Sequence, residues 1–438
     1  MSGICNPVAA GRHHLTDEEV GAFLARARGL GHDPARLLAG EVTETLTSIP
    51  ALEQARQLSQ VSPAGRRARQ AVFFHPAIAI RSRLGQGVHD RCEAYVFADG
   101  SIDDADRDRL AMHLPFPARL LSVLYRRVAA AEVWDLTMEH RVLGIDERDD
   151  LFNVVNVGEL VIEPGGRVIV QGNLLVLGCQ HLRHPAPARE AGDYQLGVLP
   201  TPRSVDRRAG PLHGLAGGPG AHGGPGRAGT RPAGAPTMIG VALSEPPGDR
   251  MNGAGGSGGA RGGDGEPGRT GGAAKTAEIT IGRLTGLLTL VASGGRGGDG
   301  GDGGDGGDGG GGGDAAPGFR TTAGPLRPGR PGRGGRGGDG GNGGRGGNGG
   351  ISSNVFVTLP ERMTGQLRVV TYPAPGGTGG VGGRPGRGGK GGRNAGPAVA
   401  AAGGGGGAPG KAGRDGVRRP APEVFVNGKP FEGRTASQ

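Results

Sequence analysis

Residues 294–313 read GGRGGDGGDGGDGGDGGGGG, so pairs of glycines alternate with one other residue, and aspartate fills every third place at Asp299, Asp302, Asp305 and Asp308. A polyproline II helix has three residues per turn and rises about 3.1 Å per residue. In that conformation the carboxylates share one edge, and the two glycine edges are bare. Because such a helix makes no internal hydrogen bonds, its buried amides need partners on neighbouring strands of the same kind.

The same three-residue period recurs in five further stretches, at 217–229, 253–271, 329–350, 377–392 and 404–416. Of the 97 glycines, 79 lie from residue 210 onward, where about one residue in three is glycine. Only 21 of the 33 prolines lie in the same span, about 9%, against the roughly 15–20% typical of collagen. An ordered bundle of glycine tracts is therefore expected in place of a collagen triple helix, with low-complexity disorder as the alternative.

The part before the tracts predicts a small, mostly helical N-terminal domain over residues 1–131. Thr16 and Glu19 form a capping-box pattern, and Asp33 followed by Pro34 predicts a second helix start. A third helix is expected near Leu52, and the apolar pattern of 117–131 predicts another. Residues 132–182 then change to short β-rich runs between glycine turns, which favour a β-solenoid-like segment.

Residues 183–236 are rich in Pro, Gly and Arg and predict a linker, and 237–438 a glycine-rich repeat region. Within it, strand segments 277–292 and 353–372 are copies, with Thr285-Gly286 matching Thr364-Gly365 and the apolar residues Leu288, Leu290 and Val291 matching Leu367, Val369 and Val370. We expect these copies to stack. The predicted fold class is multidomain: a small mostly α domain, a β-solenoid-like middle, and a tail of β-strand segments with packed polyglycine-II helices.

The tracts at 294–313, 329–350 and 376–392, with strand segments between them, resemble the glycine-rich repeat proteins of bacteria and phage. These include collagen-like and polyglycine-II proteins such as tail-fibre adhesins and mycobacterial glycine-rich repeat proteins. The resemblance covers the second half of the chain. It implies adhesion, display or scaffolding by a non-enzymatic structural or interaction protein, with a protein partner or self-association.

The charge of the tail gives an alternative, a basic RGG-type nucleic-acid-binding protein with a disordered tail. Arg333, Arg336 and Arg345 lie in Arg-Gly-Gly runs, and residues from 210 onward carry 26 basic against 15 acidic side chains. Binding of single strands usually adds aromatic stacking, and Phe319 is the only aromatic residue between 294 and 350. Nucleic acid is therefore the less favoured partner.

No motif in the sequence indicates catalysis, a cofactor or a metal. Three scattered cysteines give no disulfide framework. Successive carboxylates of the 294–313 tract would lie about 9 Å apart, too far for one tract to chelate an ion. Neither an export signal nor an apolar run long enough to span a membrane is present, so the location is unknown, cytoplasmic by default and surface- or particle-associated if the protein is exported by another route.

Two edges of opposite charge give the candidate interaction residues. The acidic edge carries Asp299, Asp302, Asp305 and Asp308, and the tract at 376–392 offers Arg384, Arg387, Lys390 and Arg393 at the same spacing. Neighbouring tracts could therefore meet charge for charge over four turns. Exposed pairs contribute only about 0–1 kcal/mol each, so they would select register and neighbour more than stability. The alternative is that both edges face solvent.

Overall fold

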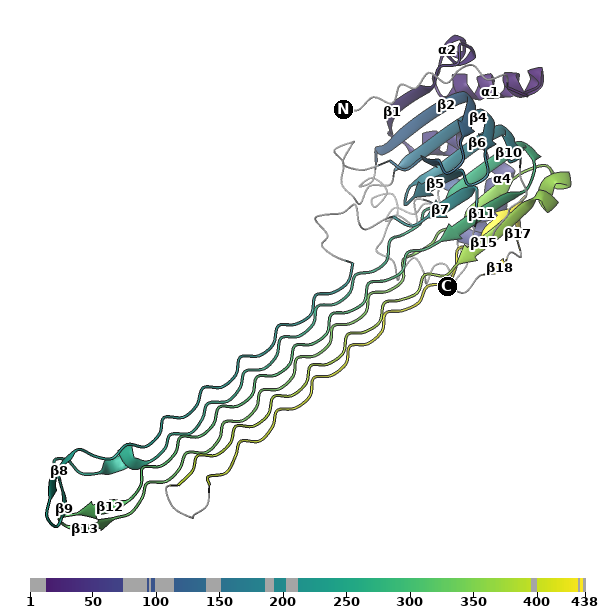
Figure 1. The fold of residues 1–438 in the computed structure, drawn as a ribbon. Helices are drawn as coiled ribbons and strands as arrows, with labels where there is room; N and C mark the ends of the chain where they lie inside the picture. Colours follow the sequence, from purple (N-terminus) through teal and green to yellow (C-terminus); the bar gives the residue numbers. More distant parts are fainter. Residues whose placement is uncertain are drawn as a thin grey trace.

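The computed structural model describes residues 13–73, 93, 96–98, 114–138, 151–185, 193–201, 212–394, 400–431 and 434–435. Figure 1 shows a head of β-sheets and helices, from which a long stalk of glycine-rich chain extends to a small distal sheet. We call that distal sheet, with the turns that join its strands, the tip.

The larger sheet of the head has eight strands in the order β1-β2-β4-β6-β10-β14-β16-β17. All neighbours from β2 to β16 pair in parallel, while β1 and β17 pair antiparallel at the two edges. The strands are β1 Thr43–Ile49, β2 Phe116–Val128, β4 Phe152–Ile162, β6 Leu174–Arg183, β10 Ala277–Thr285, β14 Val355–Thr358, β16 Val424–Val426 and β17 Lys429–Pro430.

The smaller sheet has six strands in the order β18-β15-β11-β7-β5-β3, all parallel. Its strands are β3 Val133–Asp135, β5 Arg167–Gln171, β7 Leu196–Leu199, β11 Leu288–Ser293, β15 Leu367–Tyr372 and β18 Arg434–Thr435. A short 3-10 helix, η3 (Glu361–Gln366), joins β14 to β15. From β2 onward the strands of the head lie alternately in the two sheets, apart from the edge strand β17, while β8, β9, β12 and β13 form a third sheet at the tip.

One apolar core lies between the two sheets, because side chains from both belong to the same buried cluster. Val155, Leu177 and Ile279 contribute from the larger sheet, and Val170 and Leu290 from the smaller. Pairing of β11 with β15 joins Leu288 to Leu367 and Leu290 to Val369, the positions that the sequence copies share.

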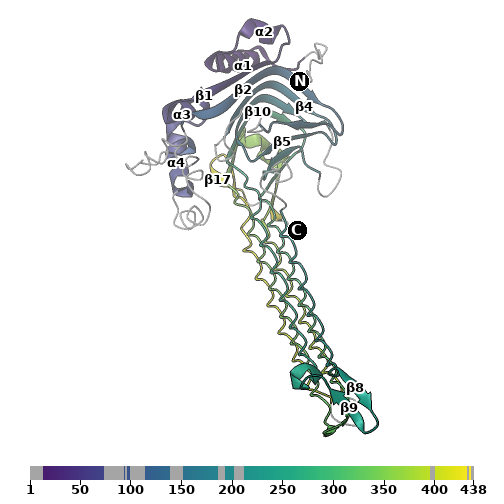
Figure 2. The same cartoon turned by 90° about the vertical axis from the view of Figure 1, so that its left-hand side faces the viewer.

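Four helices lie on the other side of the larger sheet (Figure 2): three bury apolar side chains against it, and the fourth contacts it through Arg69, which pairs with Glu278 of β10 at 2.8 Å. They are α1 Asp17–Gly29, α2 Pro34–Leu38, α3 Leu52–Leu58 and α4 Pro63–Phe73. The capping box of Thr16 and Glu19 is confirmed, as is the Asp33 cap before Pro34. Phe23 and Ala27 of α1 are buried against the sheet near Leu124, and Leu52 and Ala55 of α3 pack near Phe116 and Phe152. The larger sheet is thus covered on both faces.

The predicted fold class is wrong. Residues 1–131 do not form a small helical domain, since β1 and β2 belong to the eight-stranded sheet, and residues 132–182 do not form a separate solenoid, since their strands share both sheets with strands as far away as β16 and β18. The segment 117–131 was predicted helical and is mostly β2. A strand buried on both faces has a nearly continuous apolar run, and periodicity cannot distinguish such a run from a buried helix.

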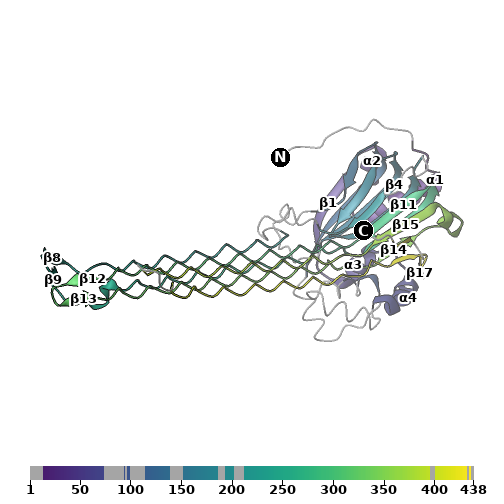
Figure 3. The same ribbon diagram turned by 60° about the horizontal axis from the view of Figure 1, so that its bottom comes forward.

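Six glycine tracts form the stalk, and they run side by side (Figure 3). We number them tract 1 (212–229), tract 2 (253–271), tract 3 (294–316), tract 4 (329–350), tract 5 (374–394) and tract 6 (400–418). Backbone hydrogen bonds recur at every third residue, which is the repeat of a helix with three residues per turn. Tracts 1, 3 and 5 run away from the head and bond to one another in parallel. Tracts 2, 4 and 6 run back to the head and also bond to one another in parallel, so bonds between the two sets are antiparallel.

The glycine content of each tract follows its number of neighbours. Tracts 3 and 4 each bond to four other tracts, and they carry glycine at two places of every three along most of their length. Tracts 1 and 6 bond to two others and need glycine at one place in three. A Cβ at Gly217 of tract 1 would lie 2.0 Å from the Gly263 oxygen, whereas one at Gly218 would meet nothing within 4 Å. Glycine is thus required where another main chain lies in contact.

Candidate functional site: the charged stalk and its tip

The aspartates of tract 3 bond to the main chain of tract 5. The Asp299 and Asp302 carboxylates accept the amide hydrogens of Thr378 and Val381, with N···O distances of 2.8 and 2.7 Å. Asp305 and Asp308 accept those of Arg384 and Arg387, both at 2.7 Å. Each bond spans 79 residues, so the two tracts run parallel without slipping. We call this row, together with Asp314, the Asp ladder.

The predicted acidic and basic edges therefore lie on adjacent tracts, but their register is shifted by two triplets. Asp299 is level with Thr378, while Arg384 is level with Asp305. No ion pair joins the four predicted aspartates to the four predicted basic residues of tract 5, all of which the structure describes. Asp299 pairs instead with Arg296 of its own tract, at 2.9 Å. Charge pairing between the two edges stays a prediction.

The far end of the Asp ladder has one gap and one further member. Gly311 stands opposite Lys390, so no carboxylate accepts the Lys390 amide there. Asp314 then accepts the amide of Arg393 at 2.6 Å. Sequence reasoning missed Asp314 because the GGD repeat is broken between residues 309 and 313, although its distance from Asp308, six residues, keeps the three-residue phase.

A second row of the same kind joins tract 4 to tract 6. The side-chain oxygens of Asp339, Asn342 and Asn348 accept amide hydrogens from Ala408, Lys411 and Val417 at 2.7, 3.0 and 2.9 Å. Since Asn replaces Asp here, a negative charge is not needed for the contact. The signal in the sequence was Asp or Asn in the third place of a GGx triplet, a short side chain with an acceptor oxygen.

Two histidines of tract 1 accept hydrogen bonds from the main chain of the Asp ladder. His213 Nδ1 accepts the Asp299 amide hydrogen at 3.0 Å, and His222 Nδ1 accepts that of Asp308 at 2.9 Å. The pKa of Asp299 is lowered, chiefly by the hydrogen bond from the Thr378 amide. These contacts supply acceptors for the Asp299 and Asp308 amides, which donate to no main-chain oxygen of the described residues.

The tip consists of two β-hairpins. In its sheet, β8 (Gly234–Thr237) pairs with β9 (Gly240–Leu243), and β12 (Phe319–Thr321) pairs with β13 (Gly324–Leu326). Thr321 joins the hairpins by pairing with Val241. A 3-10 helix, η2 (Gly248–Met251), leads back into tract 2. The turn between β8 and β9 exposes two adjacent apolar side chains, Met238 at 104% and Ile239 at 68% of full exposure.

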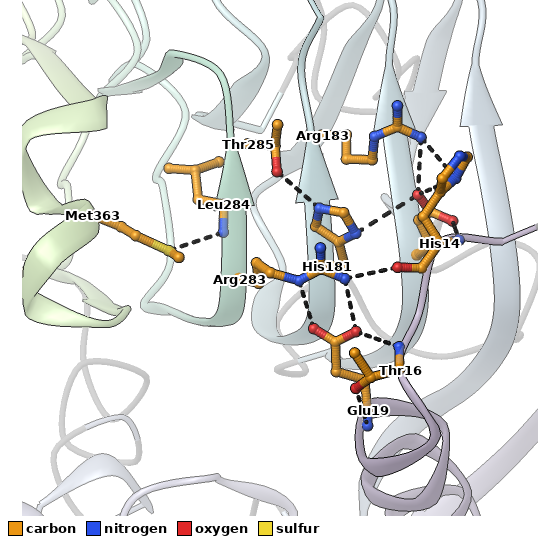
Figure 4. Close-up of polar contacts among 10 residues, drawn as sticks. His14, Thr16, Glu19, His181, Arg183, Arg283, Leu284, Thr285 and Met363 are labelled. Atoms are coloured by element: carbon orange, nitrogen blue, oxygen red, sulfur yellow. Dashed lines mark hydrogen bonds and ion pairs between the residues drawn. The ribbon is translucent and has the colours of Figure 1, made fainter.

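A buried polar cluster lies in the head, around Glu159 of β4 (Figure 4). The fully buried Glu159 carboxylate accepts the His14 amide at 2.6 Å and the Arg183 guanidinium at 3.1 Å. Glu159 is in register with His181 on β6, which in turn is in register with Arg283 on β10. Polar groups from three adjacent strands therefore meet the segment that precedes α1.

Arg283 fastens α1 to this cluster. Its guanidinium donates two hydrogen bonds to Glu19, at 2.7 and 2.8 Å, and one to the His14 carbonyl at 2.8 Å. Arg283 thereby lowers the pKa of Glu19, and burial lowers the pKa of His181, whose Nε2 lies 2.9 Å from the Thr285 hydroxyl. Because these groups bond to one another, the cluster holds the N-terminal segment on the sheet.

No group of three or more His, Cys, Asp or Glu side chains among the described residues could hold a metal ion. A small cavity between the two sheets is lined by apolar residues such as Leu136, Val168, Leu177 and Ile279. No helix in the described part of the chain is both long and apolar enough to cross a bilayer.

No family model matches the chain, and comparison with curated proteins and with solved structures gives no match either. Inference about function therefore rests on the geometry of the head, the stalk and the tip.

Proposed function

We propose that this protein is a non-enzymatic interaction protein, in which the head is a base and the stalk is a rigid spacer that presents the tip to a partner. The observation that carries the proposal is the hydrogen bonding of the stalk, in which tract 3 bonds to four neighbours through its main chain along most of its length. Such bonding converts six flexible segments into one body.

The size of this effect can be estimated. A free glycine-rich chain of about 20 residues has an end-to-end distance of roughly 25 Å and fluctuates widely. The same length in the extended three-residue helix spans about 60 Å. A bundle of six such tracts, returning three times to the head, holds that extension against chain entropy. A protein with this shape is suited to hold its tip at a fixed distance from its base.

The chemistry of the side chains also favours a structural role. Along each tract, side chains in the third place are about 9 Å apart, and the main chain fills the space between tracts. A nucleophile, a base and an orienting group need hydrogen-bond contact with one another. The buried polar cluster of the head has such contacts, but it uses them to hold α1 in place. The resemblance of the tracts to polyglycine-II proteins of bacteria and phage points to the same class of role.

The proposal is tested by changing the length of the stalk. One triplet is deleted from all six tracts at the same level, namely 217–219, 262–264, 303–305, 340–342, 382–384 and 410–412. Small-angle X-ray scattering on the full chain should show the maximum dimension falling by about 9 Å, with unchanged cooperativity of unfolding. A matched control deletes 303–305 alone, which shifts tract 3 against four neighbours and should disrupt the stalk.

An opposite result identifies the alternative. If the full chain scatters as a head with a random-coil tail, and if RNA compacts that tail in a salt-dependent way, the protein is a nucleic-acid-binding protein with a disordered tail and not a spacer. If the six-triplet deletion leaves the maximum dimension unchanged, the stalk is not the element that sets the length.

A further inference from the structure

The turn between β8 and β9 lies at the end of the molecule farthest from the head (Figure 1). Among the described residues, other large apolar side chains that are strongly exposed, such as Leu215 at 57% and Val381 at 66%, have no equally exposed apolar neighbour in sequence. Met238 and Ile239 are adjacent and more exposed than either. Met238 and Ile239 therefore form an exposed apolar pair at the far end of the molecule.

The tip and the half of the stalk nearest to it, which together are called the distal half, are strongly basic. The distal half, residues 223–258, 308–337 and 387–406, carries eleven Arg and Lys against four Asp and Glu. The half nearer the head, residues 212–222, 259–273, 294–307, 338–350, 374–386 and 407–418, carries eight against seven. The net charges are therefore +7 and +1. The bundle itself does not require this difference, because the triplet pattern is the same in both halves.

Several basic residues of the distal half are exposed without an ion pair to a described carboxylate, whereas Arg336 pairs with Asp339 at 3.1 Å. Arg227, Arg320, Arg327, Arg330 and Arg333 are exposed, and no carboxylate of the described residues forms an ion pair with them. Arg250 pairs with Glu245 at 3.0 Å, and the Arg231 guanidinium lies over the Phe319 ring. The apolar turn is therefore followed by a collar of unpaired cations.

We propose that the tip docks on a lipid bilayer with anionic headgroups, with Met238 and Ile239 entering the interface and the arginine collar contacting the headgroups. This proposal rests on the proposed function of the stalk as a spacer. Apolar side chains bordered by Arg are the combination that lies in an anionic bilayer interface. Neither element would suffice alone, because two apolar side chains bind weakly and unassisted cations do not enter the interface.

A nucleic acid fits the same charge less well. Single-strand binding uses aromatic side chains on which bases stack. Phe319 is the only aromatic residue of the distal half, and Arg231 covers its ring. A nucleic acid would also have no use for the exposed Met238 and Ile239, which an interface would bury.

The test is co-sedimentation of the full chain with phosphatidylcholine vesicles, with and without phosphatidylglycerol. We expect binding only with the anionic lipid, and weaker binding as salt rises. The double variant M238S/I239S should lose at least about tenfold in affinity. In R320Q/R327Q, each lost cation should weaken binding about fivefold. The matched controls V381S and R345Q, exposed on the stalk away from the tip, should bind like the parent chain.

Three results overturn the proposal: no binding to anionic vesicles, equal binding to neutral vesicles, or no effect of M238S/I239S. RNA binding that M238S/I239S leaves unchanged, without vesicle binding, assigns the collar to nucleic acid instead. Scattering on the same samples separates this failure from that of the spacer, since an extended stalk that ignores vesicles contradicts only the lipid assignment.

Discussion

The head and the stalk are each stabilised in a different way. In the head, Leu177 is buried between the two sheets and Phe152 is buried between the larger sheet and the helices. The apolar area that such side chains remove from water stabilises the fold. In the stalk, residues such as Gly304 have no side chain, and the main chains hydrogen-bond directly. A methyl group therefore has opposite effects in the two regions: removing one destabilises the head, and adding one destabilises the stalk.

The largest effect is expected from adding a methyl group in the centre of the stalk. A Cβ at Gly304 would lie 2.0 Å from the Gly218 oxygen and 2.6 Å from the Gly218 carbonyl carbon, and these main-chain atoms cannot rotate away. We expect G304A to cost more than about 5 kcal/mol, or to prevent assembly of the stalk. Hydrogen exchange of the tract amides measures this loss of stability of the stalk.

The control for that variant is G218A, because a Cβ there meets nothing within 4 Å. Its effect should stay within about 0.5 kcal/mol. Equal tolerance of both substitutions would mean that tracts 1 and 3 do not lie in contact.

Removal of side chain from the head should cost somewhat less. F152A deletes a fully buried ring that stacks near Phe97 and Phe116, and a loss of about 3–5 kcal/mol is expected from thermal unfolding. L46A, at a residue 53% exposed on β1, is the control and should change stability by less than about 0.5 kcal/mol. Loss of exchange protection in the stalk with F152A, before the head unfolds, would show that the two regions are not independently held.

The Asp ladder should contribute about 1 kcal/mol at each place. D305A removes the acceptor for the Arg384 amide and should cost about 0.5–1.5 kcal/mol, whereas D305N retains an acceptor oxygen and should cost much less. Equal losses in the two variants, reduced by salt, would instead support pairing of the predicted acidic and basic side chains.

Filling the gap in the Asp ladder should stabilise the stalk. A Cβ at Gly311 would lie 3.7 Å from the Lys390 oxygen, which is ordinary contact. G311D should place a carboxylate near the Lys390 amide and raise stability by about 0.5–1 kcal/mol. G311A tests whether the gain comes from the carboxylate, since it adds the Cβ alone. A gain of the same size in G311A would contradict the hydrogen-bond explanation.

The smallest effect is a dependence on acid. The Thr378 amide lowers the pKa of Asp299 below its ordinary value of 3.8, so its contribution to stability is complete above that value and is lost as pH falls through the folded-state pKa. Because the group is partly exposed, less than about 1 kcal/mol is expected. D299N should flatten the corresponding part of the stability–pH curve, and an unchanged curve would place the acid sensitivity elsewhere.

The glycine tracts could be predicted from the sequence because glycine in every third place has one simple physical cause, the contact of main chains. The register between Asp299 and Arg384 could not be predicted in the same way. Main-chain hydrogen bonds set that register, and the charge pattern of the sequence does not reflect them. β2 was read as a helix because both of its faces are buried. The polar contact between α1 and the sheet joins Glu19 to Arg283, which lie 264 residues apart. No local pattern reveals such a contact.

The six passages of the chain along the stalk have a consequence for how the gene can vary. An insertion or deletion in one tract displaces it against its neighbours, so stalk length changes only when all six tracts change together. The connections at the far end, 230–252 and 317–328, lie outside the tracts. Each can change in length and composition by itself without displacing one tract against another. Homologous chains should therefore share a stalk length while their distal turns diverge, as loops on a fixed scaffold do.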